Sequence, residues 1–568
     1  MSPTTIENTG ESAGGATEDL ERIAAALRGA AAELVPDATP SVVFEAPRNL
    51  DFGDFASNVA LQLAKSARRA PQQLASELIE RAFAGEPELR GLVAEAQAAG
   101  GFINIRMAPA YWQRTVAAIV LAGSAFGRSA TIGERVSLEF GSANPTGPLV
   151  VVQGRTLSIG DSIARAMRFC GFDVTTEWIA NDTGAQMDRA GRSLYARYRQ
   201  LDDAAYPFPD DGYPGEYLVP IAQTLRAREG SRWNDAPESE WLPYFSLYAR
   251  DVIIAQQQAT CERFRVRYDR WQSEREMHES GAVSARIAIL RGKELLYEKD
   301  GALWMRATDY GDDKDRVVIR SDGRPTYYAQ DVAYHYDKLE RTARAILILG
   351  PDHHGYIARL KALASAFGKP GAISVLIAQQ MTIVRDGEVV SSSKRQGEVL
   401  TLDEIVDEVG VDAARFFFVM PSADSPVNFD LSLAVEQSSE NPVYYVQYGH
   451  ARIASIERKA PPDLLARATR AEALERLTEP SELALARRLS EFPAIVRSVV
   501  DGLAPHRLAR YLQSVAADFH QFYMNCTVLG EDAELSVARL ALSHATKTVL
   551  ASGLDLLGVS APDAMERS

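Results

Sequence analysis

The chain has 568 residues, of which 46% are hydrophobic and 24% are charged, and its formal net charge at pH 7 is −15. This length is enough for about three domains of ~150 residues each, with the composition of an ordinary globular protein. The negative balance argues against a general polyanion binder, though not against a local basic patch. The three cysteines lie far apart and show no CxxC spacing, which predicts reduced thiols in a cytoplasmic protein. No apolar run approaches the ~18 residues that span a membrane, so we expect no membrane partner.

The first part of the chain is predicted to hold a tail and a small domain. Residues 1–18 are small and polar, without a basic start or an apolar core, which predicts a flexible tail and not a signal peptide. Residues 19–110 are expected to form a compact α+β domain. Leu20, Ile23, Ala24 and Leu27 share one helical face, and residues 101–106 alternate as a short strand.

The stretch 136–186 indicates where the functional site lies in the fold. A strand over 136–140 is followed by a loop over 141–148 that is dense in Gly, Pro and Asn, and a helical pattern then runs to Gly171. A second strand covers 174–179. A strand, helix and strand of this length form a βαβ unit, which requires a parallel sheet. Ligands of such sheets bind beyond the carboxyl ends of the strands, so this loop marks the expected site.

The segment that follows is predicted to be an insertion, at about 195–260 within a catalytic domain of residues 131–428. Residues 202–241 are rich in Pro, Gly and Asp and indicate a loop. On the preceding helix, basic and aromatic side chains alternate, which suits either a nucleic-acid backbone or a solvated helix face. These side chains are Arg189, Arg192, Tyr195, Arg197, Tyr198 and Arg199.

Residues 298–361 return to α/β patterning. We expect two strands, at 298–304 and 311–318, joined by an acidic turn, then a helix that opens at residues 324–331 and a buried strand over 345–349. Asp352, His353 and His354 follow that strand, but a third ligand at suitable spacing is lacking, so no metal site is predicted. Residues 429–568 are predicted to be helical, with one apolar stripe formed by Leu508, Leu512, Val515, Phe519 and Phe522.

The run from Glu139 to Leu149 resembles the active-site entrance of class I arginyl-tRNA synthetases of the bacterial type. Residues 46–60 and 101–104 are similar to that family's amino-terminal add-on domain, which contacts the tRNA elbow. Residues 441–452 and 554–559 are similar to its anticodon-binding bundle. The resemblance covers about residues 19–565. It implies an α/β class I Rossmann catalytic domain between an α+β amino-terminal domain and an all-α carboxy-terminal bundle.

The two signatures of the family are degenerate here, as in a divergent paralogue. Where the family has His-Val-Gly-His, its form of the HIGH signature, this chain has Val150, Val151, Val152 and Gln153. The KMSKS position reads Ser391, Ser392, Ser393, Lys394 and Arg395, so only the second lysine is kept. Some members compensate for the first lysine with one just before the HIGH motif, but the matching residue here is Gly147.

The residues that the resemblance assigns to arginine binding are all present, namely Glu139, Asn144, Tyr327 and Asp331. A planar cation is satisfied by carboxylates through paired hydrogen bonds. The alternative is that Glu139 faces solvent and Asp331 caps a helix. The missing imidazoles would normally donate to ATP phosphates at a helix start, so their loss should almost stop adenylation.

Three functions fit this pattern, and all of them imply a tRNA(Arg) partner. The leading hypothesis is an enzyme of specialised metabolism that uses arginyl-tRNA as the arginine donor to an unidentified amine, forming an amide or a cyclic dipeptide. It needs no cofactor, and His353 and His354 are the possible catalytic groups. The alternatives are a working arginine–tRNA ligase, which would need ATP and Mg, and a non-catalytic tRNA-binding regulatory protein. We expect a monomer.

Overall fold

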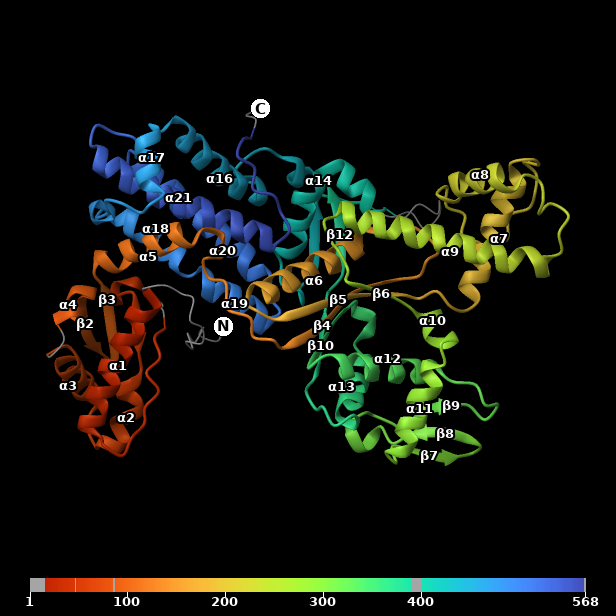
Figure 1. Cartoon of the computed structure of the whole chain (residues 1–568), viewed down its shortest axis with the longest axis horizontal. Helices are drawn as coiled ribbons and strands as arrows, with labels where there is room; N and C mark the ends of the chain where they lie inside the picture. Colours follow the sequence, from red (N-terminus) through yellow and green to blue (C-terminus); the bar gives the residue numbers. More distant parts are fainter. Residues whose placement is uncertain (1–15, 46, 48, 85–86, 391–399, 566–568) are drawn as a thin grey trace.

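The protein is described here by a computed structural model that covers residues 16–45, 47, 49–84, 87–390 and 400–565 (Figure 1). Most of the predicted tail lies outside these residues, and the first helix already begins at Ala16. The chain forms a small amino-terminal domain, a central α/β body and a helical carboxy-terminal part (Figure 1).

The amino-terminal domain packs helices against a three-stranded antiparallel sheet of order β1-β3-β2. Ile103 and Ile105 of β3 are fully buried, and β3 confirms the strand predicted over 101–106. The elements are α1 (Ala16–Leu34), β1 (Phe55–Ser57), α2 (Val59–Ala67), α3 (Pro71–Ala84), α4 (Pro87–Leu92), β2 (Val93–Ala99) and β3 (Phe102–Met107). Helix α5 (Pro109–Ala122) then leads out of this domain and packs on the helical part.

The central body is built on a five-stranded parallel sheet of order β11-β10-β4-β5-β6. Its strands are β4 (Arg135–Ala143), β5 (Asp173–Ala180), β6 (Arg270–Ser273), β10 (Arg344–Leu349) and β11 (Ile373–Ile377), and α6 (Val151–Phe169) joins β4 to β5. The predicted βαβ unit and parallel sheet are therefore confirmed. The order of connection reverses between β4 and β10, which places the ligand crevice of such sheets at their carboxyl ends.

Strand β4 continues three residues beyond its predicted end at Phe140, because its pairing with β5 shifts register between Glu139 and Gly141. Such a bulge turns the side chains on either side of it. Gly141 is required there, since an added Cβ would lie 2.3 Å from the Trp178 ring. The bulge thus lies at the point where the strand enters the predicted site.

The insertion is a helical subdomain, so the loop predicted over 202–241 is confirmed only in part, because residues 201–217 and 230–237 form no helix or strand but a helix lies between them. It consists of α7 (Ala185–Gln200), α8 (Leu218–Glu229) and α9 (Glu238–Arg263), and it extends away from the body in Figure 1. Its apolar core includes Leu194, Tyr198, Leu225 and Phe245. The Pro and Gly residues that suggested a loop flank α8, whose inward-facing stripe of Leu218, Ile221, Ala222 and Leu225 decides its structure.

A second, antiparallel sheet follows, of order β7-β8-β9, with strands β7 (Leu296–Lys299), β8 (Ala302–Met305) and β9 (Arg316–Ile319). The prediction of one strand over 298–304 is therefore wrong, while β9 confirms the end of the strand predicted over 311–318. Residues 298–304 turn at Asp300 and Gly301, whose φ angles of 52° and 72° are those of a tight hairpin. The surrounding elements are α10 (Glu274–Glu279), α11 (Ala282–Gly292), α12 (Tyr327–Arg341), η4 (Pro351–His353) and α13 (Tyr356–Ala366).

The carboxy-terminal part is all-α, as expected. The stripe from Leu508 to Phe522 lies on α20 and is buried, which confirms that prediction. Its helices are α15 (Leu431–Val435), α16 (Pro442–Lys459), α17 (Pro462–Ala468), α18 (Pro480–Ser490), α19 (Phe492–Gly502), α20 (His506–Asn525) and α21 (Ala533–Leu556). It is joined to the sheet by α14 (Leu402–Val419) and by a small sheet of β12 (Met381–Arg385), β13 (Glu388–Val389) and β14 (Val427–Asp430).

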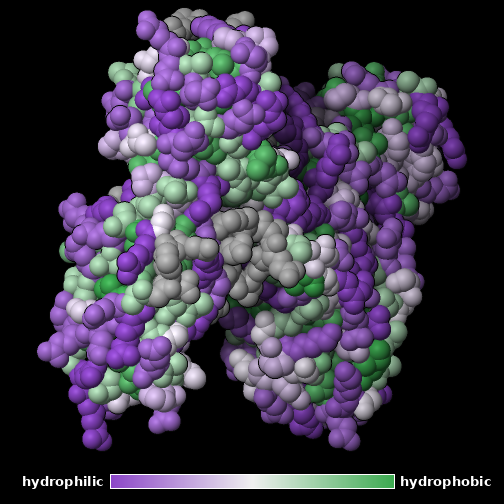
Figure 2. Space-filling model, turned by 60° about the vertical axis from the view of Figure 1, so that its left-hand side comes forward, coloured by the Kyte–Doolittle hydropathy of each residue, from purple (hydrophilic) through white to green (hydrophobic). Residues whose placement is uncertain are grey.

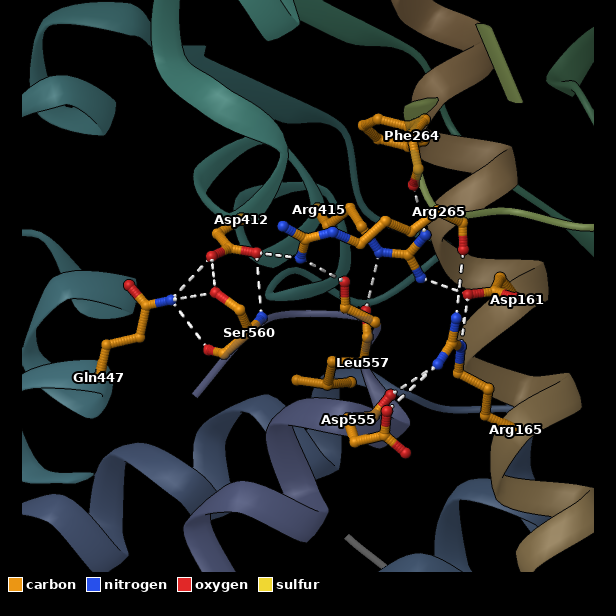
Figure 3. A network of polar contacts seen from close by, with 11 residues as sticks. Asp161, Arg165, Phe264, Arg265, Asp412, Arg415, Gln447, Asp555, Leu557 and Ser560 are labelled. Atoms are coloured by element: carbon orange, nitrogen blue, oxygen red, sulfur yellow. Dashed lines mark hydrogen bonds and ion pairs between the residues drawn. The ribbon is translucent and has the colours of Figure 1, made fainter. Parts of the chain in front are cut away.

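A buried arginine joins the helical part to the Rossmann body (Figure 3). Arg415 of α14 has no exposed surface, and its guanidinium donates to the Phe264 carbonyl at 2.9 Å and to the Leu557 carbonyl at 3.0 Å. It also pairs with Asp161 on α6. The segment after α21 is held again at Ser560, whose N–H donates to Asp412 at 3.0 Å. The end of the helical part is therefore bonded to helix α6, which begins at the expected site.

The surface is mixed in polarity. Figure 2 shows one face, on which hydrophilic side chains predominate and apolar ones occur in scattered groups. Within the part of the chain that the structure describes, no helix is both long enough and apolar enough to cross a membrane.

Candidate functional site

The site lies at the carboxyl ends of β4 and β10, where the loops 144–150 and 350–355 leave the sheet. The first loop is held from the helical insertion. The Gln257 side chain on α9, which is buried, donates to the carbonyls of Asn144 at 3.2 Å and Gly147 at 2.9 Å. The Tyr217 hydroxyl donates to the Thr146 carbonyl. Sequence reasoning missed both residues, and no local signal could have shown contacts across 110 residues and 71 residues of chain.

Helix α12 presents one polar stripe to the site, formed by residues spaced four, three, four and three apart. Its exposure falls from the first turn inward, because Tyr327 is 70% exposed while Lys338 has no exposed surface. Thr326 is the N-cap residue of this helix, and its hydroxyl accepts from the Ala329 N–H at 3.3 Å. The alternative in which Asp331 caps the helix is therefore wrong. The stripe consists of Tyr327, Asp331, Tyr334, Lys338 and Arg341.

Glu139 is buried beneath this stripe, so the alternative in which it faces solvent is wrong as well. Its carboxylate accepts from the Tyr334 hydroxyl at 2.9 Å and pairs with Lys338. Lys338 also lies 3.3 Å from Glu177 on the neighbouring strand β5, which accepts from Arg341 at 3.0 Å. Burial alone would raise the pKa of Glu177, but the charges of Lys338 and Arg341 lower it to about 2. The protein itself therefore supplies a cation for Glu139.

Asp331 lies further up the same stripe, with 32% of its side chain exposed. Its carboxylate forms a long ion pair with Arg359 of α13, at 3.8 Å. Burial raises the pKa of Asp331 to about 7, against the charge of Arg359 and with the help of the nearby carboxylates of Glu139 and Glu274. The structure thus brings two of the four predicted arginine-binding residues together, near enough for the charge of Glu139 to help raise the pKa of Asp331. A carboxylate with open surface in such a place can receive a guanidinium.

The other two predicted arginine-binding residues border the site. The Asn144 side chain is exposed on its loop, and Tyr327 stands on the first turn of α12. An added Cβ at Gly184, at the start of α7, would lie 4.0 Å from the Tyr327 hydroxyl. Tyr327 therefore reaches from α12 toward the insertion.

The degenerate HIGH position forms the start of α6. Val150 is the N-cap residue, Val151 is buried, and the Val152 side chain is 48% exposed. The Gln153 side-chain oxygen accepts from the Val150 N–H at 2.8 Å, and its amide nitrogen donates to the Ser142 carbonyl at 3.4 Å. The Val151 N–H donates to the Leu400 carbonyl at 3.1 Å. The one polar side chain of the four therefore caps the helix, and the valines have no hydrogen-bonding side chain to offer a phosphate.

The degenerate KMSKS position, residues 391–395, lies outside the described residues. The described residues that follow it, from Leu400 on, lie close to the start of α6. Thr401 forms a β-bridge with Val150, and the Leu402 N–H donates to the Leu149 carbonyl at 2.8 Å.

His353 and His354, the possible catalytic groups, are exposed on the turn after β10. The ring of His353 meets that of Tyr356 edge-on at 5.4 Å. Among the residues described, no three His, Cys, Asp or Glu side chains gather in a group that could hold a metal ion.

The basic and aromatic residues of α7 do not form a base-stacking surface. Tyr195 and Tyr198 are buried, and Tyr195 stacks on Trp241 with ring centroids 3.8 Å apart. Arg189 pairs with Asp211 at 3.1 Å and Arg192 with Glu238 at 3.0 Å. The tyrosines are therefore core residues and these two arginines lie in ion pairs on the helix face, which fits the alternative of a solvated helix face, while contact of this helix with a nucleic-acid backbone stays a prediction.

Three family models match the chain. They are the arginyl tRNA synthetase N terminal domain at residues 21–107, the catalytic domain of tRNA synthetases class I (R) at 233–419, and the DALR anticodon binding domain at 446–565. The catalytic match begins after β4 and α6, and so leaves out the degenerate HIGH position.

Similarity to known proteins extends over nearly the whole chain. The arginine–tRNA ligase of Syntrophotalea carbinolica is 43% identical over 531 residues, which are 93% of this chain and 95% of that protein. The arginine–tRNA ligase of Desulforudis audaxviator is also 43% identical, over 95% and 98% of the two chains. The arginyl-tRNA synthetase structure from Thermus thermophilus has the same fold, with a TM-score of 0.72 at 22% identity over 96% of this chain and all of that one. The chain therefore belongs to the class I arginyl-tRNA synthetase family of the bacterial type.

Proposed function

We propose that this protein binds arginine and a tRNA for arginine and acts on the ester bond that joins them. The proposal is carried by the Asp331 carboxylate, which is partly exposed at the carboxyl end of the sheet, together with the two flanking domains. These domains match the family's N terminal domain and the anticodon binding domain. We expect it to act in the cytoplasm as a monomer.

The first candidate reaction is formation of the ester, that is, arginine–tRNA ligation with ATP and Mg. The comparisons support this candidate better, because the relatives at 43% identity are named arginine–tRNA ligase. In this candidate the backbone at the start of α6, with Lys394, would have to stabilise the ATP phosphates without imidazoles.

The second candidate is use of an ester made by another enzyme. It is favoured by the side chains at the start of α6, since Val150 and Val152 cannot donate a hydrogen bond and Gln153 is engaged in capping. An arginyl ester is already activated, so its transfer to an amine, forming an amide or a cyclic dipeptide of specialised metabolism, needs no ATP. Asp331 would hold the arginyl side chain, and His353 or His354 would take the proton of the amine acceptor and pass it to the ribose oxygen of the tRNA that is released when the ester C–O bond breaks.

One experiment separates these candidates. Full-length protein is incubated in two mixtures, one with arginine, ATP, Mg and tRNA, and the other with purified arginyl-tRNA, a panel of amines and no ATP. Arginylated tRNA in the first mixture establishes ligation, and a new arginyl amide detected by mass in the second establishes transfer. Tight tRNA binding without either product would identify a tRNA-binding protein and overturn the proposal of action on the ester.

A further inference from the structure

Arg359 of α13 is a charged residue beside the arginine pocket that the proposed function does not use. Its guanidinium lies 3.8 Å from the Asp331 carboxylate, and 20% of its side chain is exposed. The guanidinium is placed over the ring of Tyr356 at 4.4 Å and that of Tyr328 at 5.8 Å. These two rings therefore border the guanidinium, which stands beside Asp331.

The charges around Asp331 are unbalanced without this arginine. Glu139 on β4 and Glu274 on α10 both disfavour ionisation of Asp331, and Arg359 is the cation that opposes them. Lys338, on the same helix, is engaged by Glu139 and Glu177.

Cations on three other elements packed against α12 are engaged elsewhere, and one of them is Arg275 on α10, which pairs with Glu279 at 2.6 Å. Arg316 on β9 pairs with Asp312 at 2.7 Å. Arg286 on α11 pairs with Asp337 at 3.4 Å. The charge state of Asp331 therefore depends on Arg359.

The state of this carboxyl group decides whether arginine can bind. A protonated carboxyl cannot form the charge-assisted paired hydrogen bonds that a guanidinium requires. Arg359 approaches from α13 and at a distance beyond hydrogen bonding, so it leaves a third of the Asp331 side chain open. We infer that Arg359 is a positioning residue, which favours the carboxylate form of Asp331 and leaves its open side to the guanidinium of the substrate. This inference rests on the proposed arginine pocket.

The first test measures arginine binding to the full chain by calorimetry from pH 6 to pH 9. Removing a neighbouring positive charge typically raises the pKa of a carboxyl by about one unit or more. With Arg359→Gln, arginine should therefore bind about fivefold more weakly at pH 7, while at pH 9 the loss should be less than about twofold. Lys361→Gln, which removes an exposed cation from the same helix, is the matched control and should leave the pH profile of the parent unchanged. A pH profile that does not move with Arg359→Gln, or tighter binding at every pH because Arg359 competes with the substrate, would overturn the inference.

The second test needs no arginine. Thermal unfolding of the parent, Asp331→Asn, Arg359→Gln and the double variant gives a double-mutant cycle. The shifts in unfolding temperature should fail to add at pH 8.5, where Asp331 is ionised, and should add at pH 5.5, where it is protonated. Additive shifts at both pH values would refute the inference. A cycle that shows coupling in a parent that binds no arginine would instead refute the proposed function and leave the ion pair established.

Discussion

Restoring the family's signature at the start of α6 should restore adenylation. The perturbation is the triple substitution Val150→His, Val152→Gly and Gln153→His, which recreates His-Val-Gly-His around the unchanged Val151. The arginine pocket and the flanking domains stay as they are. The measured quantity is arginine-dependent exchange of pyrophosphate into ATP, with tRNA present.

The expected gain in the exchange rate is large, and the expected loss in the free energy of unfolding is modest. One preorganised hydrogen-bond donor to a developing charge is worth about 10²–10³ in rate. Two imidazoles should therefore raise the exchange rate by at least that factor, and their joint effect need not multiply. Gln153→His removes the side chain that accepts from the Val150 N–H, at about 1 kcal/mol. Val152→Gly costs about another 1 kcal/mol in helix propensity, with little loss of packing because Val152 is half exposed.

Two controls make the result interpretable. Val152→Ala changes the same position without adding a donor and should leave the exchange rate at the parent's level, and tRNA binding should be equal in all variants. If the triple variant stays low, Ser391→Lys is added to restore the first lysine. A parent that exchanges within a few-fold of the restored variants would refute the argument from the lost imidazoles. A folded quadruple variant that binds arginine and tRNA but does not exchange would refute the claim that these positions alone limit the reaction.

Further predictions concern the pocket, the tRNA and the buried charges. Asp331→Asn should lower turnover of arginine or arginyl-tRNA about 30-fold or more, since breaking one partner of a desolvated charge pair costs about 2–5 kcal/mol, while binding of uncharged tRNA stays nearly intact. Equal turnover would mark the pocket as unused. The protein should prefer tRNA for arginine, with affinity falling steeply as salt rises; equal binding of unrelated tRNAs would contradict this. Lys338→Met should lower the free energy of unfolding by about 3–5 kcal/mol, because it leaves Glu139 buried without its cation and Glu177 with Arg341 alone. Because the pKa of Glu177 is lowered to about 2, its stabilising contribution is present above pH ~4.5 and is lost as the pH falls toward 2. Acid unfolding curves of the parent and Lys338→Met that run parallel would contradict that assignment.

The periodic parts of the fold could be predicted from the sequence, and the short or flanked parts could not. The β4–α6–β5 unit and the stripe on α20 follow from repeated apolar spacing over many residues. The β7–β8 hairpin escaped prediction because two four-residue strands across a two-residue turn look like one continuous strand. Helix α8 escaped because its Pro-rich and Gly-rich flanks dominate the local composition.

The same holds for the site: residues that are close in sequence could be grouped from the sequence, and contacts between distant parts of the chain could not. The spacing of Tyr327, Asp331, Tyr334 and Lys338 on one helix face is visible in the sequence. The partner of that face is not, because Lys338 meets Glu139 across 199 residues of chain. Sequence reasoning therefore named Glu139 as a ligand group without its buried cation, and it gave no sign of Gln257.

The start of α6 explains how a chain can keep the family's fold while the chemistry of its signature changes. The next residues after the signature are structural. An added Cβ at Gly154 would lie 2.7 Å from Leu402, and the buried Arg155 donates to the carbonyls of Gln379 at 2.7 Å and Ser422 at 2.8 Å. The three side chains that differ from the family's signature, at 150, 152 and 153, have no comparable structural role, whereas the unchanged Val151 is buried. Val152 is half exposed, Val150 contributes backbone contacts that any residue could make, and the cap supplied by Gln153 contributes only about 1 kcal/mol. We therefore expect substitution at these positions to change folding little and adenylation greatly, and the exchange rates of the restored variants distinguish a ligase from a user of arginyl-tRNA.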